Sequence, residues 1–230
     1  MHTGGPSRRV DPRLRASAPF IEALRRFAEL AYAPHGLQTP RWVLYDCAVI
    51  PGLVFGLAGR RDDLPATLCE SLGLATGDTG PVPLSMLIAI PTLESDHWFI
   101  YDLIDVNQVS PGAWPNDLRG ATLRAGIDLI GATEITSTAP WRSSELTIHA
   151  AYAPLQVLAA WVPNHDEPAT AVFGYRPGGA GPIESTTILD VADNRALENL
   201  QRDIEAGAKP QITGATSKGT ALPVALDPRP

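Results

Sequence analysis

The stretch "SPGAWPNDLRGATLRAGIDLIGATEITSTAPW" (residues 110–141) decides the fold class. It opens with turn residues, continues as a segment rich in small and apolar side chains, and ends in a β-branched run. The apolar run "HWFIYDLIDV" (97–106) precedes it, so the order in this part of the chain is strand, helix, strand. Such a unit requires a parallel neighbour or a crossover connection.

The helix expected at Asp117–Gly131 is apolar around most of its circumference. Two apolar stripes leave only a narrow charged arc, chiefly Arg124 and Asp128, which predicts a helix packed on a sheet. Asn116 is a suitable N-cap, and the free backbone N–H groups of the first turn form a potential anion site.

The rest of the chain is rich in strands joined by short connections. We expect a hairpin from 84–91 and 97–106, another from 155–162 and 169–175, and helices at 19–33, 62–74 and 194–207. The segment "SSELTIHAAYA" (143–153) fits either a short helix or a strand, because β-branched residues lie in its middle. The predicted class is therefore α+β, with a central, mostly antiparallel sheet, one strand–helix–strand unit and helices packed on the sheet.

The ends of the chain differ in composition from its middle. We predict a flexible arginine-rich arm at 1–18, a single α+β domain at 19–185, a C-terminal helix at 186–208 and a Pro-rich tail at 209–230.

Composition excludes several classes of protein. Hydrophobic residues make up 44% of the chain and charged residues 19%, which is enough for one substantial core. The formal charge of −7 gives no argument for nucleic acid. No apolar run reaches the roughly 18 residues of a membrane span, and no export signal follows Arg8 and Arg9. Two cysteines alone favour a reducing, cytoplasmic setting.

The order of elements resembles the GNAT family of acyl-CoA-dependent N-acyltransferases. The runs that carry the resemblance cover roughly residues 40–176, from "GLVFGLAGR" through "HWFIYDLIDV" and "NDLRGATLRAGIDLIG" to "ATAVFGY". The resemblance implies that the coenzyme A pyrophosphate lies on a helix N-terminus. Arg119, Gly120 and Ala121 supply the residue types of the family's pyrophosphate motif at a different spacing, and Pro115 stands where glycine is usual. The implied cofactor site is Asn116, Asp117, Leu118, Arg119 and Gly120.

The resemblance also implies catalytic residues. Tyr152 takes the place of the tyrosine that protonates the departing thiolate, and the base comes from the central strand, with Asp102, His97 or Asp96 in reach. Asp102 is notable on physical grounds alone, because an unpaired carboxylate among apolar strand residues is costly. Tyr152 can equally be a half-buried aromatic residue that closes a helix.

Several other polar or reactive residues were considered as parts of a site. His97, His149 and His165 lack the local spacing of a known metal site, and we assign no metal ligands. His149 fits a core histidine, and Cys47 fits a buried, inert thiol. The pair Trp141-Arg142 can stack on a planar ligand or bind a carboxylate.

Function is therefore expected to centre on a small ligand. The first hypothesis is an acyltransferase-like domain that binds an acyl-CoA or another acyl thioester and transfers the acyl group to a small amine or hydroxyl. The alternative is a non-catalytic small-molecule-binding or protein-interaction module that has lost the coenzyme motif. A homodimer or a protein partner would then dock through the terminal arms.

Overall fold

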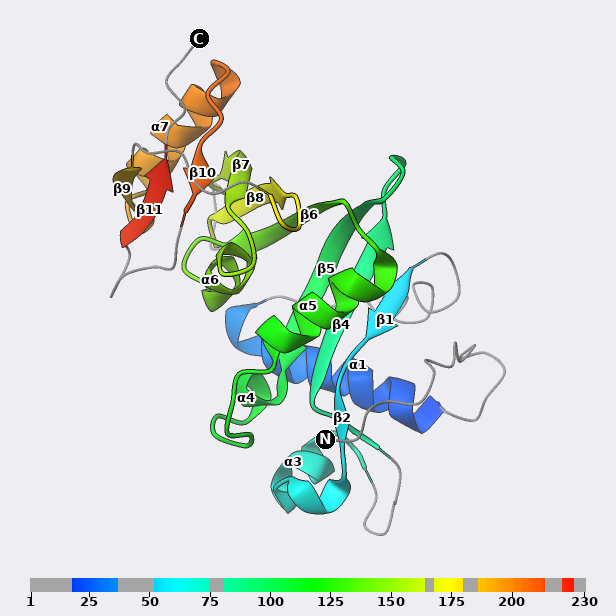
Figure 1. Cartoon of the computed structure of the whole chain (residues 1–230). Helices are drawn as coiled ribbons and strands as arrows, with labels where there is room; N and C mark the ends of the chain where they lie inside the picture. The colour runs from blue at the N-terminus through cyan, green and yellow to red at the C-terminus, as the bar shows by residue number, and fades with distance from the viewer. Residues whose placement is uncertain are drawn as a thin grey trace. The chain divides into compact units, whose positions relative to one another are not determined.

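The computed structural model describes residues 18–36, 52–74, 81–163, 168–179, 186–213 and 221–225 (Figure 1). The chain forms two compact units. Unit 1 comprises Met1–Ile88 and Ile104–Leu118, and unit 2 comprises Ala89–Leu103 and Arg119–Pro230. Strands β4 (Ser85–Pro91) and β5 (His97–Asp105) contribute residues to both.

Unit 1 is built around the amphipathic helix α1 (Ala18–Tyr32). Its apolar residues recur at helical spacing, and those buried include Leu24, Phe27 and Ala31. This face packs against β3 (Val82–Pro83) and α4 (Val106–Val109). The smaller elements are η1 (Ala33–His35), β1 (Leu53–Phe55), β2 (Ala58–Gly59), η2 (Arg61–Asp63) and α3 (Ala66–Ser71).

Strand pairing in unit 1 depends on one glycine. β1 lies beside β4, and β2 pairs antiparallel with β3. Gly56 separates β1 from β2, and a Cβ atom there would lie 2.0 Å from the carbonyl oxygen of Ser85. Any side chain at residue 56 would therefore push the chain away from β4.

Unit 2 contains most of the sheet. Within it the described strands follow the order β4-β5-β6-β8-β7-β10-β11-β9. Their bounds are β6 (Glu134–Pro140), β7 (Leu155–Trp161), β8 (Thr170–Tyr175), β9 (Thr186–Asp190), β10 (Gln211–Ile212) and β11 (Ala221–Ala225). The helices are α5 (Arg119–Ile130), α6 (Ser144–Ala150) and α7 (Asn194–Glu205).

The β5–β6 pair is parallel, and the other registers recorded in unit 2 are antiparallel. α5 connects β5 to β6, as a parallel pair requires. The predicted α+β class with a mostly antiparallel sheet is confirmed.

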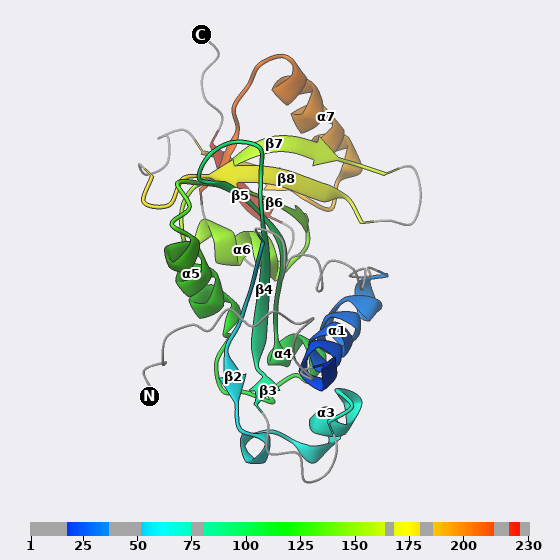
Figure 2. The ribbon, with the colours of Figure 1, turned by 90° about the vertical axis from the view of Figure 1, so that its right-hand side faces the viewer.

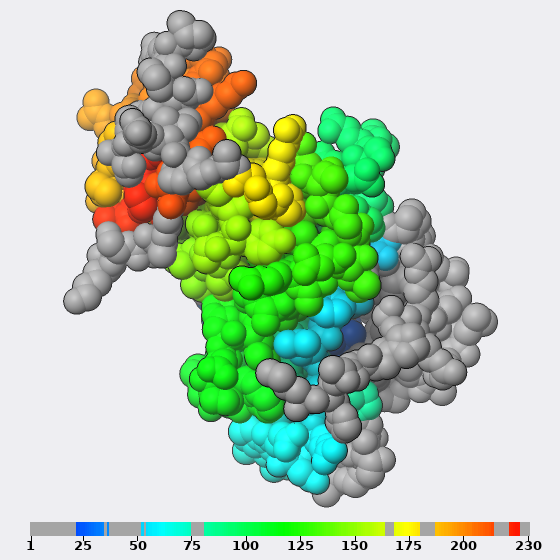
Figure 3. Space-filling model, in the orientation of Figure 1, coloured from blue at the N-terminus to red at the C-terminus, as the bar shows by residue number. Residues whose placement is uncertain are grey.

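Helices α5 and α6 lie side by side, and α6 packs on β6 (Figures 1 and 2). α5 buries Thr122, Leu123, Gly126 and Ile127, while its outward side is exposed at the surface (Figure 3). Of the small residues in this helix, Gly126 is buried, whereas Gly120, Ala121 and Ala125 are exposed and do not serve close packing. α7 packs on β7, where Gln201 Oε1 accepts the backbone N–H of Ala160 at 2.8 Å.

The 143–153 segment, for which the sequence allowed a short helix or a strand, forms the helix α6. α5 begins at Arg119, so the prediction that Asn116 is its N-cap is wrong. Within the range expected as a tail, the structure has β10 and β11, and β9 precedes α7 within the range expected as a helix.

Some predicted features fall outside the described residues. These are the arginine-rich arm up to residue 17, Cys47 and His165. In the described part of the chain, no helix is long and apolar enough to cross a membrane.

Candidate functional site

The parallel β5–β6 pair opens at one end, and we call this opening the fork. Pairing joins His97–Ile100 of β5 to residues 134–137 of β6. Beyond this register β5 continues to Asp105 and β6 to Pro140, and β6 stays paired with β8 to its last residue. The fork is thus a local separation of two strands inside the sheet of unit 2.

A buried serine closes the ladder where the fork begins. The Ser137 hydroxyl donates to the carbonyl oxygen of Ile100 at 2.9 Å. This side-chain bond lies at the last registered pair of the two strands, Ile100 and Ser137, and adds to their pairing there.

Two carboxyl groups lie close to each other on one side of the fork. Side chains alternate along a strand, so Asp102 shares the face of Ile100, and it is only 4% exposed. Glu145 comes from the first turn of α6. The residue as a whole is half-buried, but its carboxyl group lies in the interior, and burial raises its pKa to about 8. The negative charge of Asp102 raises this pKa further, whereas the positive charge of Arg119 lowers it.

This environment sets the protonation state of Glu145 at neutral pH. Because its pKa lies above 7, its carboxyl group is mostly protonated and can donate a hydrogen bond or a proton. The sequence reading missed Glu145, because an acidic residue in the first turn of a helix is ordinarily explained by the helix dipole. Only the tertiary position beside Asp102 distinguishes it.

Arg119 connects the two helices beside the fork. It is the first residue of α5, and its Nη1 donates to Ser144 Oγ, the first residue of α6, at 3.0 Å. The sequence placed Arg119 in a pyrophosphate loop. In the structure its guanidinium group lies near Glu145 and Ser144, where it balances the charge of the acidic pair.

The connection from β6 to α6 carries two buried polar atoms that have no hydrogen-bond partner among the described residues. They are Trp141 Nε1 and Ser143 Oγ. A buried donor without a partner costs about 1–3 kcal/mol, so native proteins usually satisfy it with protein, water or a ligand. Both atoms follow directly after the strand that forms one side of the fork.

Tyr152 lies at the other end of α6 in an aromatic cluster. Its ring packs edge-on against Tyr175 with centroids 6.1 Å apart. Burial raises the pKa of Tyr152, the charge of Asp128 raises it further, and Arg124 lowers it. The hydroxyl therefore keeps its proton at neutral pH. The axial rise from Glu145 to Tyr152 is about 10 Å, at 1.5 Å per residue.

His149 forms the buried centre of this cluster. Its Nδ1 is 2.9 Å from the Tyr175 hydroxyl, and its ring contacts Phe173 edge-on at 5.1 Å. Burial lowers the pKa of His149 to about 3, so the imidazole is neutral. The prediction of a core histidine is confirmed, although Nε2 lacks a partner among the described residues.

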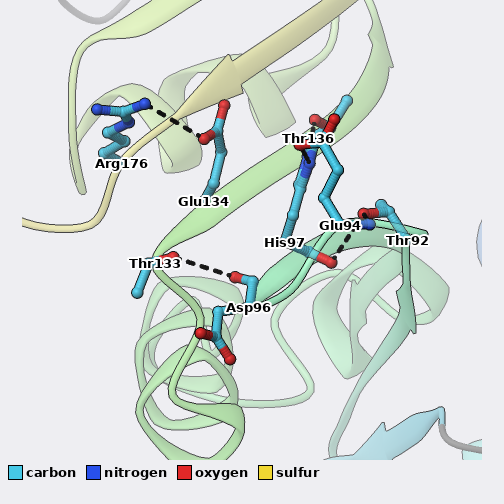
Figure 4. Close-up of polar contacts among 8 residues, drawn as sticks. All are labelled: Thr92, Glu94, Asp96, His97, Thr133, Glu134, Thr136 and Arg176. Carbon is cyan, nitrogen blue, oxygen red and sulfur yellow. Dashed lines mark hydrogen bonds and ion pairs between the residues drawn. The ribbon is translucent and has the colours of Figure 1, made fainter.

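His97 lies at the opposite end of β5 from the fork (Figure 4). Its Nε2 is 2.6 Å from Thr136 Oγ1, and its Nδ1 is 3.3 Å from a carboxylate oxygen of Glu94. Alternation places His97 on the other face of the sheet from Asp102, about 16 Å away along the strand. The structure therefore does not bring these two predicted catalytic residues together.

The predicted coenzyme loop is held by its own neighbours in unit 1. The Asn116 carbonyl accepts from Asn107 Nδ2 at 2.9 Å, and the Leu118 N–H donates to Asp105 Oδ2 at 2.9 Å. Asp117 and Gly120 are exposed. The last backbone N–H before α5, that of Leu118, is therefore already hydrogen-bonded to a carboxylate.

Asp105 has a second role at the end of β5. Its side chain accepts the Asn107 N–H, and Gln108 Oε1 accepts the Asp105 N–H, which forms a capping box for α4. The sequence "DVNQ" carries the signature of this motif, an N-cap acid followed three residues later by Gln. That signal could have placed the end of β5 one residue earlier than the predicted 97–106.

No group of three or more His, Cys, Asp or Glu side chains that could hold a metal ion occurs within the described ranges. Of the three histidines considered as metal ligands, the structure describes His97 and His149. These lie in separate contacts, with Glu94 and Thr136 in one case and with Tyr175 in the other.

No family model matches the chain, and no curated protein does. A solved structure of aminoglycoside 6'-acetyltransferase type Ii is similar over 75% of this chain and 95% of its own, with a TM-score of 0.44 and 10% sequence identity.

Proposed function

We propose that the chain is an acyltransferase-like domain that binds an acyl thioester, such as an acyl-CoA, in the fork and transfers the acyl group to a small amine or hydroxyl. The observation that carries this proposal is the fork itself, opened beside a buried pair of carboxyl groups. The order of elements that resembles the GNAT family supports it.

The fork suits an extended ligand that contains amides. The pantetheine arm of coenzyme A is such a group, since it carries two amide bonds between the thiol and the pyrophosphate. β6 continues beyond Ser137 with one edge paired to β8 and the other directed to the fork. An extended amide chain can add to a strand edge by the hydrogen bonds that a neighbouring strand would make.

The buried acids provide for proton transfer during acyl transfer. An amine attacks the thioester carbonyl, a C–N bond forms, and the C–S bond breaks. The Asp102–Glu145 pair accepts the proton released by the amine, and Tyr152 donates a proton to the departing thiolate. The raised pKa of Tyr152 keeps that proton available, and Ser143 Oγ is a free donor for the carbonyl oxygen.

The second candidate is a binding module without acyl transfer. One observation favours the binding module. The Asp105 carboxylate accepts the Leu118 N–H, in the loop where the resemblance implies a pyrophosphate. A carboxylate at that amide repels a diphosphate. Under this alternative the fork still takes a small ligand, but the nucleotide part of a coenzyme contributes nothing to its affinity.

Calorimetric titration with three probes separates the two candidates. Acetyl-CoA, S-acetylpantetheine and adenosine 3',5'-bisphosphate are each titrated into the full chain, and released thiol is then measured with a panel of primary amines. We expect S-acetylpantetheine to bind within about tenfold of acetyl-CoA, with thiol released only when an amine is present. Binding without thiol release favours the module, and failure of both thioesters to bind refutes the fork as their site.

A further inference from the structure

Arg119 stands where a helix by itself does not favour a cation. It is the first residue of α5, and the free backbone N–H groups of a first helical turn carry partial positive charge. A positive side chain at this position is repelled by its own helix. The contacts of the side chain, and not the needs of α5, therefore have to explain why an arginine is here.

The side chain of Arg119 reaches the start of the neighbouring helix. Its Nη1 donates to Ser144 Oγ at 3.0 Å, and Ser144 is the first residue of α6. Glu145 follows directly, so this contact brings a guanidinium group to the helical turn that carries the buried carboxyl group. Arg119 is half-buried, which limits the screening of its charge by salt. All these residues, and Asp102 with them, belong to unit 2.

The charges that act on Glu145 come from two neighbouring elements. Burial raises its pKa to about 8, the negative charge of Asp102 on β5 acts in the same direction, and the positive charge of Arg119 on α5 lowers the pKa. The other titratable side chain of α6, His149, is neutral because burial lowers its pKa to about 3. Arg119 is therefore the charge that keeps Glu145 from binding its proton still more tightly.

This opposition matters for a group that must exchange a proton. General acid–base catalysis is most efficient when the pKa of the catalytic group lies near the working pH. A buried carboxyl group beside a carboxylate, with no positive charge near it, keeps its proton far above neutral pH. With Arg119 in place, the pKa of Glu145 stays close enough to neutrality for the proton to leave and return.

We propose that Arg119 is a positioning residue for the Asp102–Glu145 pair: it ties the start of α6 to α5 and holds a positive charge beside Glu145, so that the pair can exchange its proton. This inference rests on the proposed function, in which the pair accepts the proton released by the amine. It gives Arg119 a role different from the one that the resemblance implies, which is to bind a pyrophosphate.

The test follows the side-chain carboxyl carbon of Glu145 by ¹³C NMR between pH 5 and pH 10, in the full chain and without a thioester. Glu145→Gln assigns the signal by its disappearance. We expect the midpoint of the titration at about pH 8 in the wild type. In Arg119→Gln we expect it at least about one pH unit higher, because an opposite charge within about 4–6 Å shifts a carboxyl pKa by about 1–3.

Two further variants separate the charge from the hydrogen bond, and they also supply the test if Arg119→Gln does not fold. Arg119→Lys keeps the positive charge, so its midpoint should lie closer to that of the wild type than to that of Arg119→Gln. Ser144→Ala removes the hydroxyl that accepts from Arg119 Nη1, so the midpoint should rise, but by less than in Arg119→Gln. Arg195→Gln, an exposed arginine of α7, is the matched control and should leave the midpoint unchanged.

The inference is overturned if Arg119→Gln titrates at the same pH as the wild type, or if Arg195→Gln raises the midpoint equally. It is also overturned if neither Arg119→Lys nor Ser144→Ala behaves differently from Arg119→Gln. Because no thioester takes part in this titration, its outcome is separate from that of the binding experiment. A higher midpoint in Arg119→Gln, together with thioesters that fail to bind, would support the role of Arg119 in the pair and refute the acyl transfer.

Discussion

The two ends of the β5–β6 pair differ in almost every physical respect. At the start of the strands, His97 hydrogen-bonds Thr136 across the pair, and the carbonyl of Asp96 accepts the N–H groups of Thr133 and Glu134 (Figure 4). At the other end pairing stops, and Asp102 lies beside the carboxyl group of Glu145. At the start of the strands the polar residues tie β5 to β6, whereas at the other end the acids are buried at an opening, where we propose the ligand site.

Replacing the buried acid should give the largest effect. Asp102→Asn keeps the shape of the side chain but removes the base, so we expect the rate of acyl transfer to fall about 100-fold or more. Glu198→Gln, an exposed acid on α7, is the control and should stay within twofold. The measurement is thiol release from acetyl-CoA. Equal rates for the two variants would show that the acidic pair takes no part.

The second prediction concerns pH and Glu145. Its pKa of about 8 in the folded protein lies above the value of 4.5 for an unperturbed side chain. The folded state therefore binds this proton more tightly than the unfolded chain does. The resulting stability is fully present below pH 4.5 and is lost as pH rises through about 8.

Glu145→Gln removes this dependence. Relative to the wild type, its free energy of unfolding should rise between pH 4.5 and pH 8 by on the order of 3 kcal/mol, at 1.36 kcal/mol per pKa unit. Urea unfolding at pH 5 and pH 8.5 measures the change. Glu198→Gln, an exposed residue of α7, should show no pH-dependent difference. A flat result for Glu145→Gln would mean that its carboxyl group is solvated.

The two ends of the β5–β6 pair also differ in how much of each could be predicted from the sequence. Amphipathic spacing and turn residues located α1, α5, α7 and both hairpins, because local periodicity reports burial directly. Asp102 was found because a carboxylate inside an apolar strand is conspicuous. Glu145 and Ser137 were not found, since nothing in the sequence states where pairing between β5 and β6 stops. β9, β10 and β11 were missed because short strands beside proline and glycine carry little pattern.

Removing one hydroxyl group at each end of the β5–β6 pair compares how much each hydrogen bond contributes to the free energy of unfolding. Ser137→Ala removes a fully buried hydrogen bond to the Ile100 carbonyl and should cost about 1–3 kcal/mol in the free energy of unfolding. Thr136→Val removes the bond to the half-buried His97 and should cost about 0.5–1.5 kcal/mol. Urea unfolding at pH 7 ranks them. The reverse order would place the tighter constraint at the start of the strands.

The smallest effect is expected at the surface beside His97. Arg176 Nη2 is 3.5 Å from Glu134 Oε2, and both side chains are largely exposed, at 77% and 42%. Because exposed ion pairs contribute little, Arg176→Gln should change the free energy of unfolding by less than about 0.5 kcal/mol. A loss above about 1 kcal/mol, by the same urea titration, would mean that this end of the pair is more rigid than its exposure indicates.

Amide hydrogen exchange tests the central claim, that the fork is the site of the acyl thioester, most directly. The chain is compared with and without S-acetylpantetheine, and the exchange rates of β6 amides are read residue by residue. We predict that Thr138, the last amide of β6 on the β5 side, gains at least tenfold protection, while Ala139, whose N–H is directed to β8 like that of Trp141, changes less than twofold. Protection that is unchanged at Thr138, or that rises equally at Thr138 and Ala139, would contradict the account.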